Sequence, residues 1–215
     1  MRTAKERLSH LLELAAKGAA ERAALAGEVA NLLHDWPPAY PAAMRASFEA
    51  LLEKIAREVD EAGRRDLARR FEASGDAPLS LLNELFLSSS DAMRDEILRR
   101  NDAHARSAVA RVDGAMLLAA ARKRGDFPSV LAHAAAVPRS ISAKITADVS
   151  GRSLAVVVKG AGLERPIYSG ICILTMAAPF AALSVYDYVP PNGAANLLTF
   201  WRAKLDTSLG HDAAA

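Results

Sequence analysis

The amino-acid sequence predicts an all-α fold, and three observations support this prediction. Alanine and leucine dominate a chain of 215 residues in which aromatic residues make up only 6%, and both are among the best helix formers. In addition, apolar residues recur every three or four positions over much of the chain, which is the spacing of one face of a helix. The third observation is an internal repeat.

Three copies of the pattern Arg-x-x-apolar-Ala follow one another at intervals of 42 residues. Their arginine and apolar residues are Arg22 with Leu25, Arg64 with Leu67, and Arg106 with Val109. A fixed period near 40 residues in a helical chain is typical of stacked helical hairpins of the HEAT or armadillo kind. Each hairpin alone would expose an apolar flank, and stacking against the next hairpin would bury it. We therefore expect these six residues to fix the stacking of the hairpins.

The first predicted helices form a hairpin followed by a longer helix. Residues 4–17 and 20–35 each carry an apolar stripe, and the prolines that follow would end the second helix. Residues 42–60 carry a third stripe. Gly63 marks a turn before a further helix at residues 64–73. These segments supply the first two copies of the repeat.

Four more helices are expected before residue 125. The first begins near Pro78, because an aspartate cap followed by an early proline favours a helix start. Residues 92–100, 103–111 and 114–124 each follow a serine or aspartate that can act as a cap. The helix at residues 103–111 would carry the third copy of the repeat.

The composition changes where the repeat fades. Residues 1–126 contain 20 acidic and 20 basic residues, whereas residues 127–215 contain only 12 charged residues. We therefore predict a helical-repeat region of about three hairpins at residues 1–125. A divergent, apolar helical region at residues 126–215 would pack on it to complete one continuous domain.

The C-terminal region is expected to be helical, with one ambiguous segment. Residues 127–148 are predicted to form one or two short helices around Pro138, and residues 193–207 a last helix. Residues 153–162 allow two interpretations. Their consecutive valines favour a strand, whereas the alanine-rich context and the glycines at the end favour a short helix.

Residues 166–186 carry no charge, and a stretch of 21 residues is long enough to span a bilayer. Pro179 near its middle, together with several polar residues, instead favours two buried helices. We therefore expect no membrane span.

Several short motifs along the chain point to a known family. They are Glu21-Arg22-Ala23-Ala24-Leu25-Ala26, Arg64-x-x-Leu67-Ala68, Ala77-Pro78, Ala108-x-Ala110-Arg111, Gly151-Arg152-x-Leu154-Ala155, Gly162-Leu163 and Phe200-Trp201-Arg202. In these motifs the chain resembles the DUF2336 family of uncharacterised alphaproteobacterial proteins. The resemblance implies an all-helical, HEAT-like fold over nearly the whole chain, without an assigned reaction. A resemblance in fold does not by itself imply a function.

Cys172 is the only cysteine, so the chain cannot form an internal disulfide. This is typical of proteins that work in the reducing cytoplasm, which is where we expect this one. Its apolar neighbours disfavour the thiolate form. We therefore expect Cys172 to be a buried packing residue and not a nucleophile.

No motif in the chain predicts catalysis, a metal site or a cofactor. His10 and Glu13 lie one helical turn apart, but a metal site needs further ligands. Gly160 and Gly162 lack the third glycine of a nucleotide-binding loop, and the serines at residues 88–90 are typical of helix caps. We therefore expect a non-enzymatic protein without metal or cofactor.

The repeat arginines allow a structural and a functional interpretation. In the structural one, each arginine bonds a carboxylate or carbonyl group of the next hairpin. The candidate carboxylates are Glu21, Asp66, Asp102 and Asp113. In the functional one, the arginines form a basic stripe that contacts the phosphates of a nucleic acid. The balance of acidic and basic residues in residues 1–126 favours the structural interpretation.

His34 offers another functional alternative, as the phospho-acceptor of a signalling protein. It stands at the end of a predicted helix and precedes Asp35, which would orient the imidazole. However, Pro37 and Pro38 follow at once and would end the helix, and the helix dipole favours a histidine at that end. The sequence therefore favours a structural role for His34.

These observations favour an interaction or regulatory scaffold whose hairpins present a groove or face to a protein partner. The C-terminal region would either cap the stack or provide an apolar docking surface at residues 150–205. Phosphotransfer through His34 is the first alternative, and nucleic-acid binding through an arginine-lined face is the second. The sequence leaves the oligomeric state open.

Overall fold

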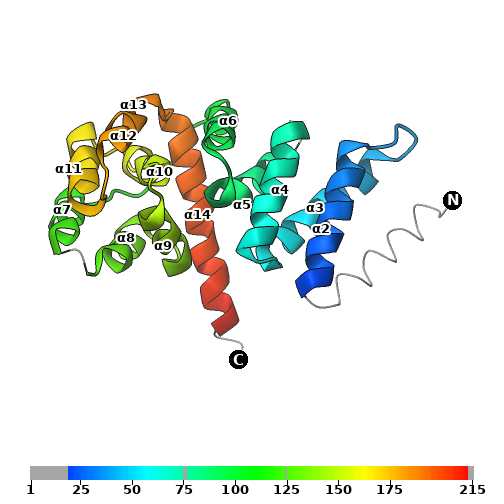
Figure 1. The fold of residues 1–215 in the computed structure, drawn as a ribbon, viewed down its shortest axis with the longest axis horizontal. Coiled ribbons are helices and arrows are strands. Elements are labelled where there is room, and N and C mark those ends of the chain that lie inside the picture. The colour runs from blue at the N-terminus through cyan, green and yellow to red at the C-terminus, as the bar shows by residue number, and fades with distance from the viewer. Residues whose placement is uncertain (1–18, 75–76, 124, 213–215) are drawn as a thin grey trace. The chain divides into compact units, whose positions relative to one another are not determined.

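The computed structural model describes residues 19–74, 77–123 and 125–212, and all of the regular structure in these residues is helical (Figure 1). The all-α prediction is therefore confirmed. The predicted helix at residues 4–17, with His10 and Glu13, lies outside the described residues. No described helix combines the length and the apolar character needed to cross a membrane.

The chain divides into two compact units that meet between Met93 and Arg94. This boundary falls within α6 (Asp91–Asp102) and not near residue 125, where a change of region is predicted. The reason is that α7 (Gly114–Lys123) packs against α8 (Phe127–Ala135). A helix from the predicted repeat region thus belongs to the same unit as the apolar C-terminal helices.

The first unit has a core built from the predicted apolar stripes. Its described elements are α2 (Ala19–His34), α3 (Ala42–Glu58), α4 (Glu61–Ser74), α5 (Leu79–Leu85) and the 3₁₀ helix η1 (Phe86–Ser88). Helices α2 and α5 each pack against α3 and α4. The buried side chains include Leu25, Val29, Leu33, Phe48, Leu52, Ile55, Leu67, Phe71, Leu81 and Leu85. The predicted helices at residues 20–35 and 42–60 are confirmed to within two residues at each end.

Gly63 does not mark a turn as predicted, because α4 already begins at Glu61. The Asp60 side chain accepts a hydrogen bond from the Gly63 N–H, with Oδ1 and N 2.8 Å apart. The Asp60 carbonyl accepts a second one from the Arg64 N–H. Asp60 is therefore the N-terminal cap of α4, and Gly63 lies inside the first turn.

The second unit is built around α10 (Arg152–Gly160). Besides α7, α8 and the part of α6 from Arg94 onward, its described helices are α9 (Arg139–Ala147), α11 (Arg165–Thr175), α12 (Phe180–Leu183), α13 (Val185–Tyr188) and α14 (Pro191–Asp212). Helix α10 contacts α9, α11, α13 and α14 (Figure 1). The side chains of residues 154–158 are all buried, as expected for a helix that is apolar on every side. The ambiguous segment is thus a helix in spite of its valines.

Helices α10 and α14 approach each other closely at Gly160. A Cβ atom at this position would lie 2.7 Å from the carbonyl oxygen of Ala194 in α14. Such a distance is too short for a non-bonded contact, so the crossing depends on glycine. Gly162, with φ of 74°, then leads the chain away from the end of α10.

The helix predicted at residues 103–111 is wrong, because α6 ends at Asp102 and residues 105–113 form no regular structure. Asp102 does cap a helix, but a different one. Its Oδ1 accepts hydrogen bonds from the N–H groups of Asn192 (3.1 Å) and Gly193 (3.0 Å) at the start of α14. The third predicted hairpin therefore does not form, and a HEAT-like arrangement is not confirmed.

The remaining C-terminal predictions are confirmed in outline. Helices α8 and α9 lie on either side of Pro138, and α14 contains the predicted last helix. The uncharged residues 166–186 contribute to three short helices, α11 to α13, where two were expected. The chain leaves α11 at Met176, which has an extended backbone, and resumes α-helix at Phe180 directly after Pro179.

Candidate docking surface

The first two repeat arginines contact the same end of one helix. Arg22 Nη1 lies 2.9 Å from Glu58 Oε2 in the last turn of α3. Arg64 donates from Nε to the Ala56 carbonyl (3.0 Å) and from Nη2 to the Arg57 carbonyl (2.8 Å). Carbonyl groups at a helix C-terminus lack partners inside the helix. The two arginines thus hold α2 and α4 against the C-terminal end of α3.

The third repeat arginine does not continue this arrangement. Arg106 is exposed and Val109 is half-buried, and both lie in the segment without regular structure. Leu25 and Leu67, by contrast, are buried in the helical core of the first unit. The first two copies of the 42-residue repeat therefore lie in helices, whereas the third copy lies in a segment without regular structure.

The carboxylates predicted as partners of the arginines are bonded elsewhere. Asp66 accepts a hydrogen bond from Arg70 Nε (2.8 Å). Asp113 accepts from two backbone N–H groups at the start of α7, and Asp102 caps α14. The side chain of Glu21 lies outside the described residues. The predicted partners are therefore wrong for these three carboxylates.

His34 is the last residue of α2, and its side chain is exposed. The Asp35 N–H still donates to the Asn31 carbonyl (3.0 Å), after which the chain leaves the helix. The predicted position at a helix C-terminus is confirmed, and phosphotransfer through His34 stays a prediction.

Many of the arginines on the first unit lie beside acidic residues. The pairs include Arg45 with Glu49, Arg57 with Glu53 and Glu84, and Arg69 and Arg70 with Asp66. Neighbouring opposite charges reduce the net positive potential that a phosphate backbone would meet. These pairs are what a solvated, charge-balanced face is expected to show.

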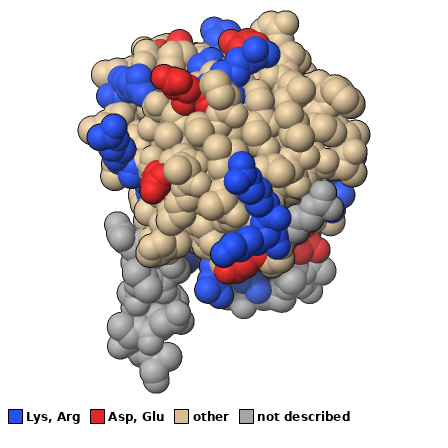
Figure 2. All heavy atoms as spheres, turned by 90° about the vertical axis from the view of Figure 1, so that its left-hand side faces the viewer, with Lys and Arg blue, Asp and Glu red and all other residues tan. Residues whose placement is uncertain are grey.

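The second unit exposes large apolar side chains in its uncharged segment. Ile173 on α11 exposes 59% of its surface, and Phe180 at the start of α12 exposes 86%. Figure 2 shows the side of this unit on which α7 and α11 lie, and broad parts of that face carry no charged side chain. An apolar surface without charge is typical of interaction sites.

A hollow of about 390 Å³ is formed at the end of α11, and three of its lining residues lie between Ile173 and Phe180 in the sequence. Its lining residues come from α8, α9, the end of α11 and the chain that follows α11, and none of them is charged. They are Phe127, Pro128, Thr146, Thr175, Met176 and Ala177. We define the docking surface as Ile173, Phe180 and these six residues.

Tyr168 anchors the docking surface from inside the unit. Its hydroxyl is buried and donates to the Ala182 carbonyl (2.7 Å), which ties α12 to α11. Burial raises the pKa of Tyr168 well above its usual value, so the hydroxyl keeps its proton at neutral pH. Cys172 on the same face of α11 is buried as predicted, and burial also raises the pKa of its thiol.

Lys159 and Tyr186 fix the far end of the same segment. Lys159 Nζ donates to the Tyr186 carbonyl (2.6 Å) and lies 4.6 Å from the centre of the Tyr186 ring. The Tyr186 hydroxyl in turn donates to the Leu163 carbonyl (2.7 Å). Helix α12 is thus attached at Ala182 and α13 at Tyr186, so Phe180 projects from a supported element.

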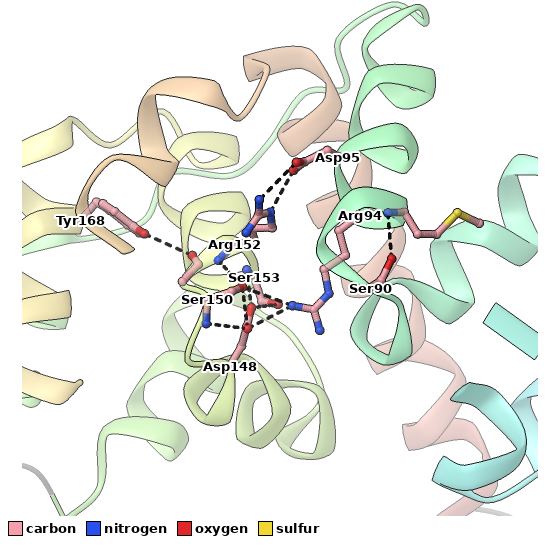
Figure 3. Close-up of polar contacts among 10 residues, drawn as sticks. Ser90, Arg94, Asp95, Asp148, Ser150, Arg152, Ser153 and Tyr168 are labelled. Atoms are coloured by element: carbon pink, nitrogen blue, oxygen red, sulfur yellow. Dashed lines mark hydrogen bonds and ion pairs between the residues drawn. The ribbon is translucent and has the colours of Figure 1, made fainter. Parts of the chain in front are cut away.

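A buried carboxylate orders the turn between α9 and α10 (Figure 3). The Asp148 side chain is only 7% exposed, and its Oδ1 lies 3.0 Å from Arg94 Nη1. Its Oδ2 accepts from the Ser153 N–H (2.9 Å) and hydroxyl (2.6 Å), and the Ser150 hydroxyl donates to Oδ1 (2.7 Å). Burial alone would raise the pKa of Asp148. The hydrogen bonds from Ser153 and the charge of Arg94 outweigh this effect and lower the pKa.

The Asp148 cluster was not predicted from the sequence, although three of its residues lie close together in the chain. The pattern Asp148-x-Ser150-x-x-Ser153 spans the start of α10, and short polar side chains in such positions commonly bond the free N–H groups of a helix start. Arg94 comes from α6, far away in sequence, so no local pattern identifies it as the partner.

A second hollow, of about 600 Å³, lies at the starts of α7 and α11. Arg111, Asp113 and Glu164 are among its lining residues, so it carries charges of both signs. The Asp113 carboxylate is already occupied in capping α7. No three His, Cys, Asp or Glu side chains in the described part of the chain are grouped to hold a metal ion. We therefore place the candidate site at the docking surface.

No family model, no curated protein and no solved structure matches the chain. The resemblance to DUF2336 therefore stays a prediction.

Proposed function

We propose that this protein is a non-enzymatic interaction module that binds a protein partner through the docking surface. The observation that carries the proposal is the exposure of Ile173 and Phe180 beside an apolar hollow. Burial of apolar surface is the main favourable term in most protein association. Large aromatic and aliphatic side chains that fill pockets dominate binding energies.

The support beneath the docking surface favours binding without a large rearrangement. Tyr168 fastens α12 through the Ala182 carbonyl, and Lys159 fastens the chain at Tyr186. A side chain held on a fixed element loses less conformational entropy on binding than one on a mobile loop. Phe180 is therefore suited to act as a preorganised anchor.

The chemistry of the docking surface favours a protein over a nucleic acid. Its eight residues are all uncharged, whereas affinity for nucleic acids depends on lysine and arginine contacts to phosphates. The buried Cys172 and Tyr168 have raised pKa values and are engaged in packing and helix attachment. Their environments support a structural role in preference to a catalytic one.

Site-specific photo-crosslinking in cells tests this proposal. A photo-reactive phenylalanine analogue would replace Ile173 or Phe180 in the full chain, with the same replacement of Val149 as control. Val149 is 87% exposed and belongs to the same unit, but it lies in the turn before α10 and outside the docking surface. We expect a discrete protein adduct from positions 173 and 180 and none from position 149. Equal adducts from all three positions, or none from 173 and 180, would contradict the proposal.

A further inference from the structure

We propose that the occupant of the docking surface is a second copy of this chain, with Phe180 of each copy inserted into the hollow of the other. This inference rests on the proposed function and names its partner. It implies a dimer with a two-fold axis, in which the same surface of both copies takes part.

The docking surface contains both a projecting side chain and a hollow that suits it. Phe180 is 86% exposed, and the hollow has a volume of about 390 Å³. An apolar cavity of about 150 Å³ is already large enough to hold a benzene ring. The hollow therefore has room for a phenylalanine side chain from another molecule.

The projecting side chain and the hollow are close enough to meet across a two-fold axis. Ala177 lines the hollow and stands three positions before Phe180, so their Cα atoms are at most about 11 Å apart. In a symmetric interface, the contact of Phe180 with the hollow occurs twice, once in each direction. A short separation lets both contacts form within one compact interface.

The absence of charge in residues 166–186 favours a self-complementary interface. A surface that meets itself brings like charges together, which is unfavourable. Here the eight residues of the docking surface carry no charge. The charged residues that flank this segment are Arg165 and Asp187, which have opposite charges. They form an ion pair with each other, with Arg165 Nη2 3.2 Å from Asp187 Oδ2.

Sedimentation of the purified full chain tests the inference. We expect a reversible monomer–dimer equilibrium for the wild type and a dissociation constant at least about 30-fold weaker for Phe180→Asp, as for loss of a central anchor. Val149→Asp is the matched control, because it introduces the same charge at an equally exposed apolar residue and should leave dimerisation unchanged. Circular dichroism would verify that both variants stay folded.

A mixing experiment tests the predicted contact directly. Thr175→Lys alters the hollow but leaves Phe180 intact, whereas Phe180→Asp does the reverse. In a mixed dimer the introduced lysine and aspartate would face each other with opposite charges. Each variant alone should be monomeric. A mixture should form heterodimers, because the Phe180 of one variant can enter the intact hollow of the other. Complementation would not occur if the substitutions acted only by weakening the fold.

Three outcomes would overturn the inference: a monomeric wild type, a Phe180→Asp variant that dimerises normally, or a mixture that stays monomeric. A monomeric wild type together with photo-adducts of a different protein from positions 173 and 180 would reject the second copy and leave the proposed function standing. A monomeric wild type without any photo-adduct would reject both.

Discussion

At the scale of single residues, the polar side chains with the most specific contacts stabilise the fold itself. Arg22 and Arg64 secure the C-terminal end of α3, and Asp148 orders the start of α10. The residues proposed to act outside the fold, Ile173 and Phe180, are apolar. Because the residues of the candidate site are apolar, a search for motifs of catalytic residues does not identify it.

The Asp148 cluster is expected to contribute strongly to stability. Asp148→Asn should lower the free energy of unfolding by about 3 kcal/mol, because it removes one charge of the largely buried ion pair with Arg94. Asp95→Asn is the matched control, since the Asp95 carboxylate is 58% exposed in its pair with Arg152. Its loss should cost at most about 1 kcal/mol. Urea unfolding at neutral pH measures both values, and equal losses would refute the role assigned to Asp148.

The lowered pKa of Asp148 predicts that the free energy of unfolding depends on pH. This pKa is lower in the folded protein than in the unfolded chain, so the unfolded state binds the proton more readily. The stabilisation by Asp148 is therefore complete above the unfolded value of about 4 and is lost as the pH falls through the native pKa. We expect the difference in unfolding free energy between wild type and Asp148→Asn to shrink below about pH 4. A difference that stays constant from neutral pH to pH 3 would argue against this pKa shift.

At the scale of elements, helices were predictable where an apolar stripe coincided with a local start or stop signal. Residues 20–35 and 42–60 are examples, because the prolines between them leave little freedom in the boundary. The helix at residues 103–111 failed because Asp102 caps a helix start far away in sequence. The sequence indicated a docking surface only as the broad range 150–205, which leaves out Phe127, Pro128 and Thr146. Which of its side chains face outward depends on the packing of α11 and α12.

The close crossing of α10 and α14 gives a test at this scale. Gly160→Ala should destabilise the protein by about 1–3 kcal/mol, because the new methyl group would overlap the Ala194 carbonyl. Gly27→Ala in α2 is the matched control. Its methyl group would meet the Arg70 side chain at an ordinary 3.6 Å and should stabilise the helix by up to about 1 kcal/mol. Thermal unfolding of both variants would show whether the two effects have opposite signs.

The non-helical segment between α6 and α7 gives a second test. Arg106 and Arg111 are exposed there on irregular backbone, whereas Arg99 is exposed on a helix. Within residues 94–123, brief trypsin treatment should therefore cut first after Arg106 or Arg111. Mass spectrometry of the fragments would identify the site. A first cut after Arg99 would contradict the expectation that the irregular segment is cleaved more readily than α6.

At the scale of the whole molecule, ion pairs occur in both units, whereas the exposed large apolar side chains of the described residues lie in the second unit. The first unit carries ion pairs over its helices, and the second exposes the uncharged docking surface. We therefore assign partner binding to the second unit. We also predict that phosphotransfer at His34 and nucleic-acid binding through arginines, the alternatives raised by the sequence, do not describe the main function.

The most direct measurement is the native size of the protein in gentle cell extracts, compared between wild type and two variants. Wild type and Val149→Asp should elute in a complex larger than the 22.9 kDa chain, because position 149 lies outside the docking surface. Ile173→Asp should elute as a folded monomer, since it places a charge within the uncharged docking surface. A wild type that elutes as a monomer, or an Ile173→Asp variant that co-elutes with the wild-type complex, would contradict the assignment of function to the docking surface.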